Sequence, residues 1–352
     1  MEVDQGWLEG PGREVRDFPG RAAPGHVVER MDRSVACGVS RADYTDSVLL
    51  ITSLRRWRWR GLAAVVVLVV GWLGSSFAVA DRLTRRHGAP AGDAPEVPFA
   101  RTETVALLAR DGARVPGWAF DVQGARGTVV LLHPNGGTAA SMREVAELWA
   151  ELGWASLALT LRAHGEAEGA RNDVGWSARL DVVAGVEWAV SRRAGPVIVH
   201  GVSLGAAAAC LAAPEHGERA RRRIVGHVLE APYVDLVSAV EARTTRELAW
   251  PLGTVAAVGL RLVAPQFIGD LARIAPLGAA PELAGSVLLL SGLLDTRAPA
   301  AGTRRFAAVL GTRATLVERE LGHTGWLAAG PGGPLRADLA AWLVRLAMTA
   351  PE

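Results

Sequence analysis

Apolar residues in the larger, C-terminal part of the chain form short continuous runs, separated by longer segments with helical spacing. A short continuous apolar run predicts a strand buried on both faces of a sheet. Such a run lies at residues 128–132, and further strands are predicted at 155–161, 197–200, 224–230, 287–291 and 314–320. Helical spacing predicts helices at residues 141–152, 176–190, 300–310 and 335–347. This alternation predicts an α/β fold, in which helices cover both faces of a mostly parallel sheet.

Two stretches depart from the alternation. Residues 104–110 and 115–121 predict a hairpin around Asp111-Gly112, and this hairpin would form the antiparallel edge of the sheet. Residues 233–281 are helix-like and contain no strand pattern, although they lie between two predicted strands. We interpret 233–281 as a helical cap over the carboxyl edge of the sheet, where ligands bind in such folds. A helix pair that packs in the core and has no lid role would give the same apolar pattern.

An uncharged segment near the N-terminus has the length of a membrane span. Residues 61–80 carry no charge and would extend about 30 Å as a helix, the thickness of a bilayer core. The segment Arg55-Arg56-Trp57-Arg58-Trp59-Arg60 precedes them, and both residue types suit a membrane interface. We therefore expect a single membrane helix at 55–80, with the N-terminus inside the cell and the domain exported.

Two other interpretations of this helix remain open. It ends in Ala78-Val79-Ala80, a small-residue pattern that signal peptidase cleaves, and cleavage there would release a secreted domain starting at Asp81. Alternatively, the segment is a buried core helix, although its arginine flank is unusual for one.

The segments on either side of this helix lack sustained periodicity. Residues 1–54 mix glycine, proline, arginine and aspartate, and we expect them to lack regular structure. A start at Met31 would make the first thirty residues no part of the protein. Residues 81–101 are rich in alanine, proline, glycine and charges, which predicts a linker to a domain at 102–352.

Composition excludes several classes of protein. The chain has 352 residues, of which 50% are hydrophobic and 21% charged, and its net charge is +2. That balance argues against nucleic-acid binding, and every basic residue is arginine. The two cysteines, Cys37 and Cys210, are far apart, so neither a disulfide framework nor a zinc-binding spacing is present.

The candidate nucleophile lies between the strand that starts at Val197 and an alanine-rich run. Gly201-Val202-Ser203-Leu204-Gly205 follows the pattern Gly-x-Ser-x-Gly, and strand, turn and helix is the context in which this pattern forms a nucleophile elbow. The turn forces its serine into a strained backbone, so small residues must flank it. The simpler alternative is an ordinary strand-to-helix turn in a glycine-rich chain.

A serine hydroxyl is a weak nucleophile that needs a base, and the base needs a carboxylate to orient it. Asp295 follows the predicted strand 287–291, and His323 follows the last predicted strand. The order serine, acid, histidine is the order of α/β-hydrolase triads. Taken singly, Asp295 could be a turn residue and His323 a helix cap. Glu230, at the end of another predicted strand, is the reserve acid.

The oxyanion of an acyl-transfer intermediate needs two N–H donors. We expect one from the backbone of Leu204 and the other from Asn135, in the loop His133-Pro134-Asn135-Gly136-Gly137. Pro134 has no N–H and cannot donate. We expect His133, His164 and His200 to be structural, and Arg162 either to pair with a carboxylate or to be solvated.

Residues 102–347 resemble the α/β-hydrolase superfamily, within it the serine-aminopeptidase and monoacylglycerol-lipase-like branch, and especially its membrane-anchored members. These read His-Gly-Asn-x-Gly where this chain has His133-Pro134-Asn135-Gly136-Gly137, and Asp-x-Arg-Gly-x-Gly where it has Thr160-Leu161-Arg162-Ala163-His164-Gly165. Glu230-Ala231-Pro232-Tyr233 matches the start of their cap. The departures are Pro134 for glycine, Thr160 for aspartate and Ala163 for glycine.

The resemblance implies a serine hydrolase with Ser203, Asp295 and His323 as triad and the amides of Asn135 and Leu204 as oxyanion hole. Such an enzyme cleaves an ester, thioester or amide through an acyl-enzyme and needs no cofactor or metal. We expect a carboxylesterase or lipase acting on a small-molecule or lipid-like acyl substrate. A peptidase or acyltransferase with the same triad remains open, as does a non-catalytic binding protein of this fold. The oligomeric state is left open.

Overall fold

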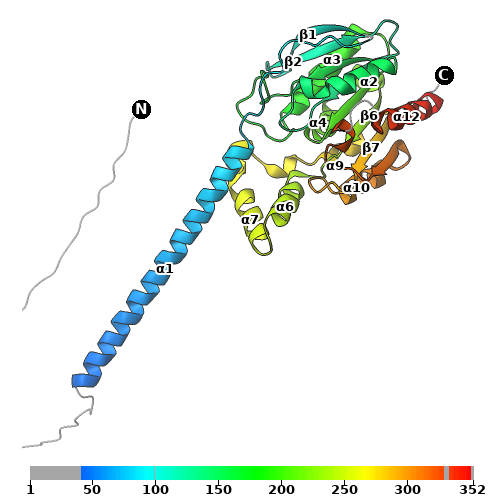
Figure 1. Ribbon diagram of the computed structural model, residues 1–352. Helices are drawn as coiled ribbons and strands as arrows, with labels where there is room; N and C mark the ends of the chain where they lie inside the picture. The colour runs from blue at the N-terminus through cyan, green and yellow to red at the C-terminus, as the bar shows by residue number, and fades with distance from the viewer. Residues whose placement is uncertain (1–40, 99, 329–332, 350–352) are drawn as a thin grey trace, which may run out of the picture. The chain divides into compact units, whose positions relative to one another are not determined.

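A computed structural model describes residues 41–98, 100–328 and 333–349 of the chain. The described residues include an eight-stranded sheet in the order β1-β2-β4-β3-β5-β6-β7-β8 (Figure 1). The strands are β1 (Arg101–Leu108), β2 (Arg114–Asp121), β3 (Thr128–Leu132), β4 (Ala155–Leu159), β5 (Val197–Val202), β6 (Ile224–Glu230), β7 (Ser286–Gly292) and β8 (Ala314–Arg319). The predicted strands are confirmed, and β1 and β2 form the predicted antiparallel hairpin at one edge. From β4 through β8 all neighbours run parallel.

Helices follow most of the strands. They are α2 (Arg143–Glu151), α3 (Ala178–Arg192), α4 (Leu204–Ala212), α5 (Glu218–Arg223), α10 (Ala300–Leu310), α11 (Gly325–Ala328) and α12 (Leu335–Thr349). Short 3-10 turns lie at η1 (Ala139–Met142), η2 (Ala213–Glu215), η3 (Leu271–Arg273), η4 (Ala280–Glu282) and η5 (Gly311–Arg313). Sequence analysis did not predict α5, because its arginine-rich sequence has almost no apolar residues to reveal a helical period.

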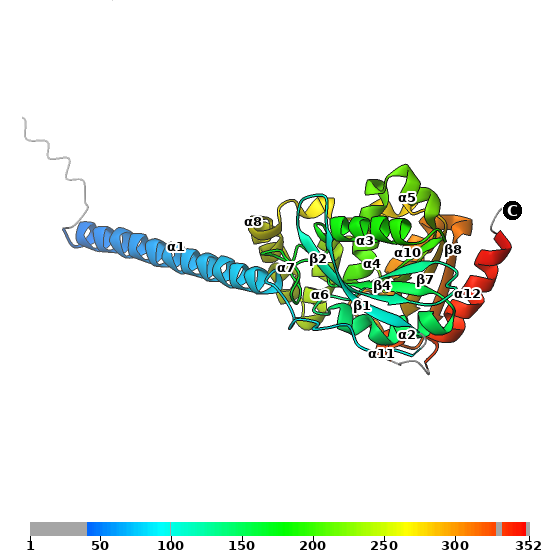
Figure 2. The ribbon, with the colours of Figure 1, turned by 90° about the horizontal axis from the view of Figure 1, so that it is seen from above.

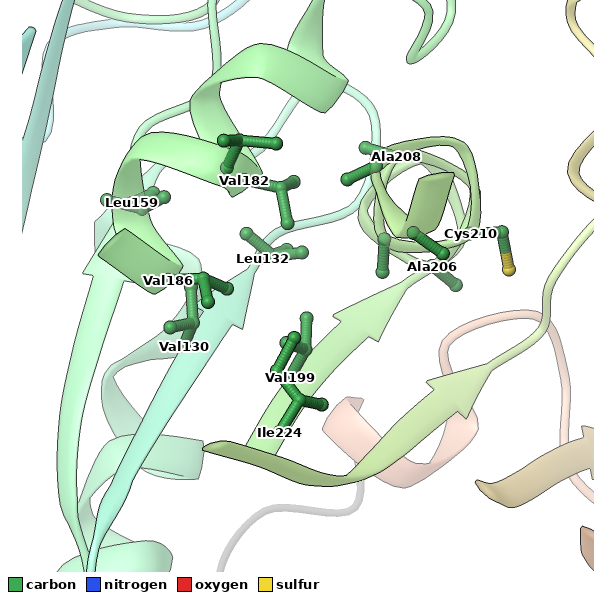
Figure 3. Close-up of a cluster of buried hydrophobic side chains, with 14 of the residues drawn as sticks. Val130, Leu132, Leu159, Val182, Val186, Val199, Ala206, Ala208, Cys210 and Ile224 are labelled. Atoms are coloured by element: carbon green, nitrogen blue, oxygen red, sulfur yellow. The ribbon is translucent and has the colours of Figure 1, made fainter. Parts of the chain in front are cut away.

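The central strands of the sheet are buried on both faces, which explains their continuous apolar runs. Along β3, Val130 and Leu132 face a core formed with α3, α4 and α10, while Val129 and Leu131 face a second core formed with α2, α11 and α12. Figure 2 shows these two helical layers on opposite sides of the sheet, and Figure 3 shows the first core.

The predicted interval 233–281 is helical and contains no strand. It holds α6 (Leu236–Glu247), α7 (Leu252–Val263), α8 (Pro265–Ile268) and α9 (Pro276–Ala279), and α6 lies beside α7 (Figure 1). Leu236, Ile268 and Ile274 of this interval form a small apolar cluster together with Leu211 of α4. Whether it opens and closes as a lid remains a prediction.

The predicted apolar helix lies inside the longer helix α1 (Arg41–Leu83), which therefore begins earlier than 55. Its part Thr52–Leu83 is long and apolar enough to cross a membrane, and an 18-residue window within it has a mean hydropathy of 2.3. Residues 41–54, expected to lack regular structure, belong to this helix, whereas 1–40, with Met31 and Cys37, lie outside the described residues. The chain divides into two compact units, Met1–Ala63 and Ala64–Glu352, and the contacts described below all lie within the second.

The residues that follow α1 form hydrogen bonds with the rest of the second unit. The His87 amide donates to the Ala163 carbonyl at 2.9 Å, and the Trp118 indole donates to the Gly92 carbonyl at 3.1 Å. The linker predicted at 81–101 therefore begins with the last turn of α1 and then follows the surface of the domain.

A buried ion pair ties the loop after β4 to the helix α3. Asp181 is fully buried, and it accepts hydrogen bonds from the Arg162 backbone at 2.7 Å and from the Arg162 guanidinium at 2.6 and 2.9 Å. The same guanidinium also bonds Asp111 in the hairpin turn, whose side chain is 40% exposed. Arg162 was expected either to pair with a carboxylate or to be solvated, and in the structure it pairs with two carboxylates.

We predict that Asp181→Ala lowers the free energy of unfolding by about 3 kcal/mol or more, because it leaves the Arg162 charge buried without its main partner. Urea denaturation measures this. The matched control is Asp111→Ala, which removes the exposed partner of the same arginine and should cost about 1 kcal/mol or less. Equal losses for the two variants would contradict the prediction.

Candidate active site

Ser203 lies in the sharp turn between β5 and α4. Its backbone has φ 52° and ψ −105°, a left-handed conformation that is strained for a residue with a side chain. A β-carbon on Gly201 would lie 2.5 Å from the Gly205 carbonyl group, and one on Gly205 would lie 2.7 Å from the carbonyl carbon of Leu132. Both distances are below van der Waals contact, so the turn requires glycine at both positions, as the Gly-x-Ser-x-Gly pattern indicated.

The structure brings Ser203, His323 and Asp295 together. Ser203 Oγ lies 2.8 Å from His323 Nε2, and His323 Nδ1 lies 2.7 Å from Asp295 Oδ2. With the proton on Nδ1, the imidazole donates to Asp295 and accepts from the serine hydroxyl. Each of the three residues leaves the carboxyl edge of the sheet, Ser203 after β5, Asp295 after β7 and His323 after β8.

Asp295 is buried and held in place by its own loop. Its Oδ1 accepts hydrogen bonds from the amides of Arg297 at 2.8 Å and Ala298 at 2.9 Å. The second oxygen is left for His323, so the carboxylate fixes one orientation of the ring. Asp295, and not the reserve candidate Glu230, therefore supplies the oxygen at Nδ1.

Glu230 contributes to the site through its backbone. Its side chain is buried at the end of β6, and its carbonyl accepts the Ser203 amide at 2.8 Å. This bond fixes Ser203, the central residue of the elbow, against the neighbouring strand.

His133 and His200 are buried and neutral, and His164 is buried. Burial lowers the pKa of His133 and of His200 to about 3. His133 Nδ1 donates to the Pro134 carbonyl at 2.8 Å, and its Nε2 accepts the Leu161 amide at 3.0 Å. The Trp149 indole donates to His200 at 3.1 Å, and burial also lowers the pKa of His164. These contacts are structural ones.

The loop with Asn135 lies beside the serine. Pro134, Asn135, Ser203, Leu204 and His323 line one cavity. Asn135 Oδ1 accepts from Asn172 Nδ2 at 2.6 Å and lies 3.2 Å from His164 Nε2, which anchors the loop. Sequence analysis missed Asn172, because it lies in an irregular segment without a recognisable motif.

Two departures from the family pattern have local explanations. Ala163 has φ 59°, the left-handed region that favours the glycine of the pattern. Thr160 accepts the Ala139 amide at 3.1 Å, so its hydroxyl helps to orient the loop after β3.

The cavity at Ser203 has a volume of about 280 Å³. Most of its lining is apolar, and the cap is the largest contributor, with further residues from the end of α1 and the turn after it. The cap lining includes Tyr233, Leu236, Val237, Val240, Leu260, Ala264, Ile268 and Leu271. Ala80, Leu83 and Thr84 of the α1 end complete this wall.

Comparison with known proteins agrees with this fold. A profile of the family described as serine aminopeptidase, S33, matches residues 123–267. An esterase from Pyrococcus furiosus superposes with a TM-score of 0.57 at 22% identity, over 74% of this chain and 98% of that one. An acetyl xylan esterase from Paenibacillus sp. R4 superposes with a TM-score of 0.52 at 16% identity, over 78% of this chain and 93% of that one. An α/β-hydrolase from Vibrio vulnificus superposes with a TM-score of 0.51 at 23% identity, over 70% of this chain and 81% of that one. No curated protein is significantly similar in sequence.

We predict that Gly205→Ala destabilises the protein by about 3 kcal/mol, because the added methyl overlaps the backbone of Leu132. Thermal or urea unfolding measures the loss. Gly278→Ala is the matched control, since its methyl would meet only the Ala275 β-carbon at 3.9 Å, and it should change stability by about 1 kcal/mol at most. A Gly205→Ala variant as stable as the control would refute the close approach.

Proposed function

We propose that the chain is an α/β-hydrolase and a serine hydrolase that cleaves carboxylic esters through an acyl-enzyme, which the family profile over residues 123–267 and the esterases of the same fold support. The observation that carries the proposal is the pair of contacts from Ser203 to His323 and from His323 to Asp295, at 2.8 and 2.7 Å. In this proposal Ser203 is the nucleophile, His323 the general base and Asp295 the orienting acid.

The chemistry follows from these contacts. As Ser203 Oγ forms a bond to the acyl carbon, its proton moves to His323 Nε2, and the carbonyl π electrons move onto the oxygen. The amides of Leu204 and Asn135 are the proposed donors to that oxyanion. When the carbonyl re-forms, the ester C–O bond breaks and His323 gives its proton to the leaving alkoxide. Water, deprotonated by His323, then attacks the acyl-serine, and Ser203 recovers its proton.

The lining of the cavity favours an acyl ester over a peptide. An aminopeptidase must bind a substrate ammonium group, for which a carboxylate is the natural partner. The described lining contains no carboxylate, and its charged residues are Arg243, Arg261 and Arg297. Esterases among the solved structures of the same fold agree with this preference. The family description, serine aminopeptidase, supports the alternative of a peptidase. An acyltransferase would form the same acyl-enzyme and then pass the acyl group to an acceptor other than water.

We also propose that α1 remains attached as a membrane anchor, with the domain on the outer side. Ala80 is only 3% exposed and lines the cavity at Ser203. The residue after it, Asp81, bonds Arg171, and the Thr84 hydroxyl donates to the Ala80 carbonyl at 2.9 Å. A peptidase would have to open this packed turn in order to cut after Ala80.

We predict that a fluorophosphonate probe labels the protein at Ser203 and that Ser203→Ala abolishes labelling. The same variant should lower kcat for a p-nitrophenyl ester by about 10⁴-fold or more, because the nucleophile is gone. Circular dichroism serves as the folding check. A folded wild-type protein that neither labels nor turns over would refute a serine hydrolase and support a binding protein.

Two further variants in this assay separate the carboxylates. Asp295→Asn should lower kcat by about 10⁴-fold, since an amide cannot stabilise the charged imidazole. Glu230→Gln keeps the backbone bond to Ser203 and should lose far less. The reverse order would assign the acid role to Glu230.

Mass spectrometry of the protein purified from membranes tests the retained anchor. We predict that the mature chain includes residues before Ala80, because that turn is part of the cavity wall. A mature N-terminus at Asp81 would instead establish a cleaved signal and a secreted enzyme.

A further inference from the structure

The end of α1 is part of the substrate cavity as well as of the candidate anchor. Ala80, Leu83 and Thr84 line the same cavity as Ser203 and His323. The wall opposite the elbow therefore comes partly from the helix that is long and apolar enough to cross a membrane. A substrate in this cavity contacts that helix directly.

The cap also contacts α1 about one to two turns before that end. Trp72 Nε1 donates to the Val255 carbonyl at 3.2 Å, and a β-carbon on Gly259 would lie 2.8 Å from that indole nitrogen. Phe77 stacks on Phe267 with ring centroids 4.7 Å apart. Glycine at 259 thus permits a close helix crossing.

This packing sets the depth of the cap. Trp72 precedes Ala80 by about 12 Å along the helix. If residues 61–80 occupy the bilayer core, α7 lies at the level of the outer leaflet. The outer surface of α7 suits that place, because its exposed side chains include Leu252, Val255, Val258 and Leu262, and Trp250 before it is 85% exposed.

Three arginines give the otherwise apolar cavity its charge. Arg243 of α6, Arg261 of α7 and Arg297 after β7 all line it, and no described residue forms an ion pair with any of their side chains. Elsewhere arginines of this chain pair with carboxylates, as Arg304 does with Glu318 and Arg319 with Asp338. The cavity thus carries a positive charge that the protein itself leaves unbalanced, beside a nucleophile and an apolar wall.

We propose that the substrate is an amphiphilic acyl ester with an anionic headgroup, taken from the outer leaflet of the membrane. The apolar wall formed by the cap and the α1 end receives the acyl chain, and the guanidinium groups of Arg243, Arg261 and Arg297 bind a phosphate or carboxylate on the alcohol side. This inference rests on the proposed function and names its substrate class. Guanidinium groups match the bidentate geometry of such anions.

The headgroup is tested with two substrates of equal acyl chain, a monoacylglycerol and a monoacylglycerol phosphate, offered to the full chain in vesicles of neutral lipid. The wild type should have the higher kcat/KM for the phosphate. In Arg243→Gln/Arg261→Gln the ratio of kcat/KM, anionic to neutral, should fall about tenfold or more, because charge-assisted hydrogen bonds are lost. The control is Arg305→Gln, an exposed arginine of α10 outside the cavity lining, which should retain the ratio. An unchanged ratio in the double variant overturns the headgroup assignment.

The source of the substrate is tested with a short-chain acylglycerol phosphate that is soluble as a monomer. Leu262→Ser makes the outer surface of α7 more polar, so the ratio of the vesicle rate to the soluble rate should fall severalfold. Val309→Ser is the control, because Val309 is exposed to a similar degree on α10. An unchanged ratio for Leu262→Ser would mean that the anionic ester comes from solution and would overturn the membrane source.

Covalent labelling keeps this test apart from that of the proposed function. The fluorophosphonate can label Ser203 and the protein can hydrolyse a short neutral ester while the variants change neither the anionic-to-neutral ratio of kcat/KM nor the vesicle-to-soluble ratio of rates. In that case the proposed substrate class is wrong, but the protein is still a serine hydrolase. If Ser203 does not label, the proposed function itself fails.

Discussion

The turn at Ser203 depends on how closely α4 approaches the strand β3. At Gly205 the helix lies against the carbonyl group of Leu132 with no room for a methyl group. That approach starts α4 immediately after Ser203, directs the hydroxyl toward the carboxyl edge and frees the Leu204 amide from strand pairing. Small residues continue along α4, and the buried Ala206, Ala208 and Cys210 face the core (Figure 3). The apolar core and the reactive turn are thus products of the same close packing.

Much of the fold could be predicted because burial on both faces leaves a strong pattern. The centre of a strand such as β7 is a continuous apolar run, Val287-Leu288-Leu289-Leu290, and this run predicts the strand. The three residues Ser203, Asp295 and His323 could be paired because parallel strands deliver their ends to one edge, so order along the chain becomes proximity in space. The catalytic roles assigned to them remain a prediction.

Other features could not be predicted, since they depend on contacts between distant segments. The Asn172 side chain donates a hydrogen bond to the Asn135 side chain, 37 residues away in the sequence, and no local sequence pattern predicts this contact. The early start of α1 was missed because its first residues are polar and follow no apolar period. Composition showed that the chain uses arginine alone, but could not tell Arg162, which is held by two carboxylates, from Arg261, which faces a cavity.

The contribution of α1 to the cavity has a practical consequence for anyone who prepares this protein. Truncation is the usual way to make an anchored enzyme easy to purify, and here a fragment beginning after Leu83 would leave the cavity open on one side. It would also uncover the surface of Gly259 that packs on Trp72, and so expose apolar area that favours aggregation. Rates measured on such a fragment would describe a wider, wetter cavity than the one the intact chain possesses. Removing α1 would therefore change the cavity at Ser203 as well.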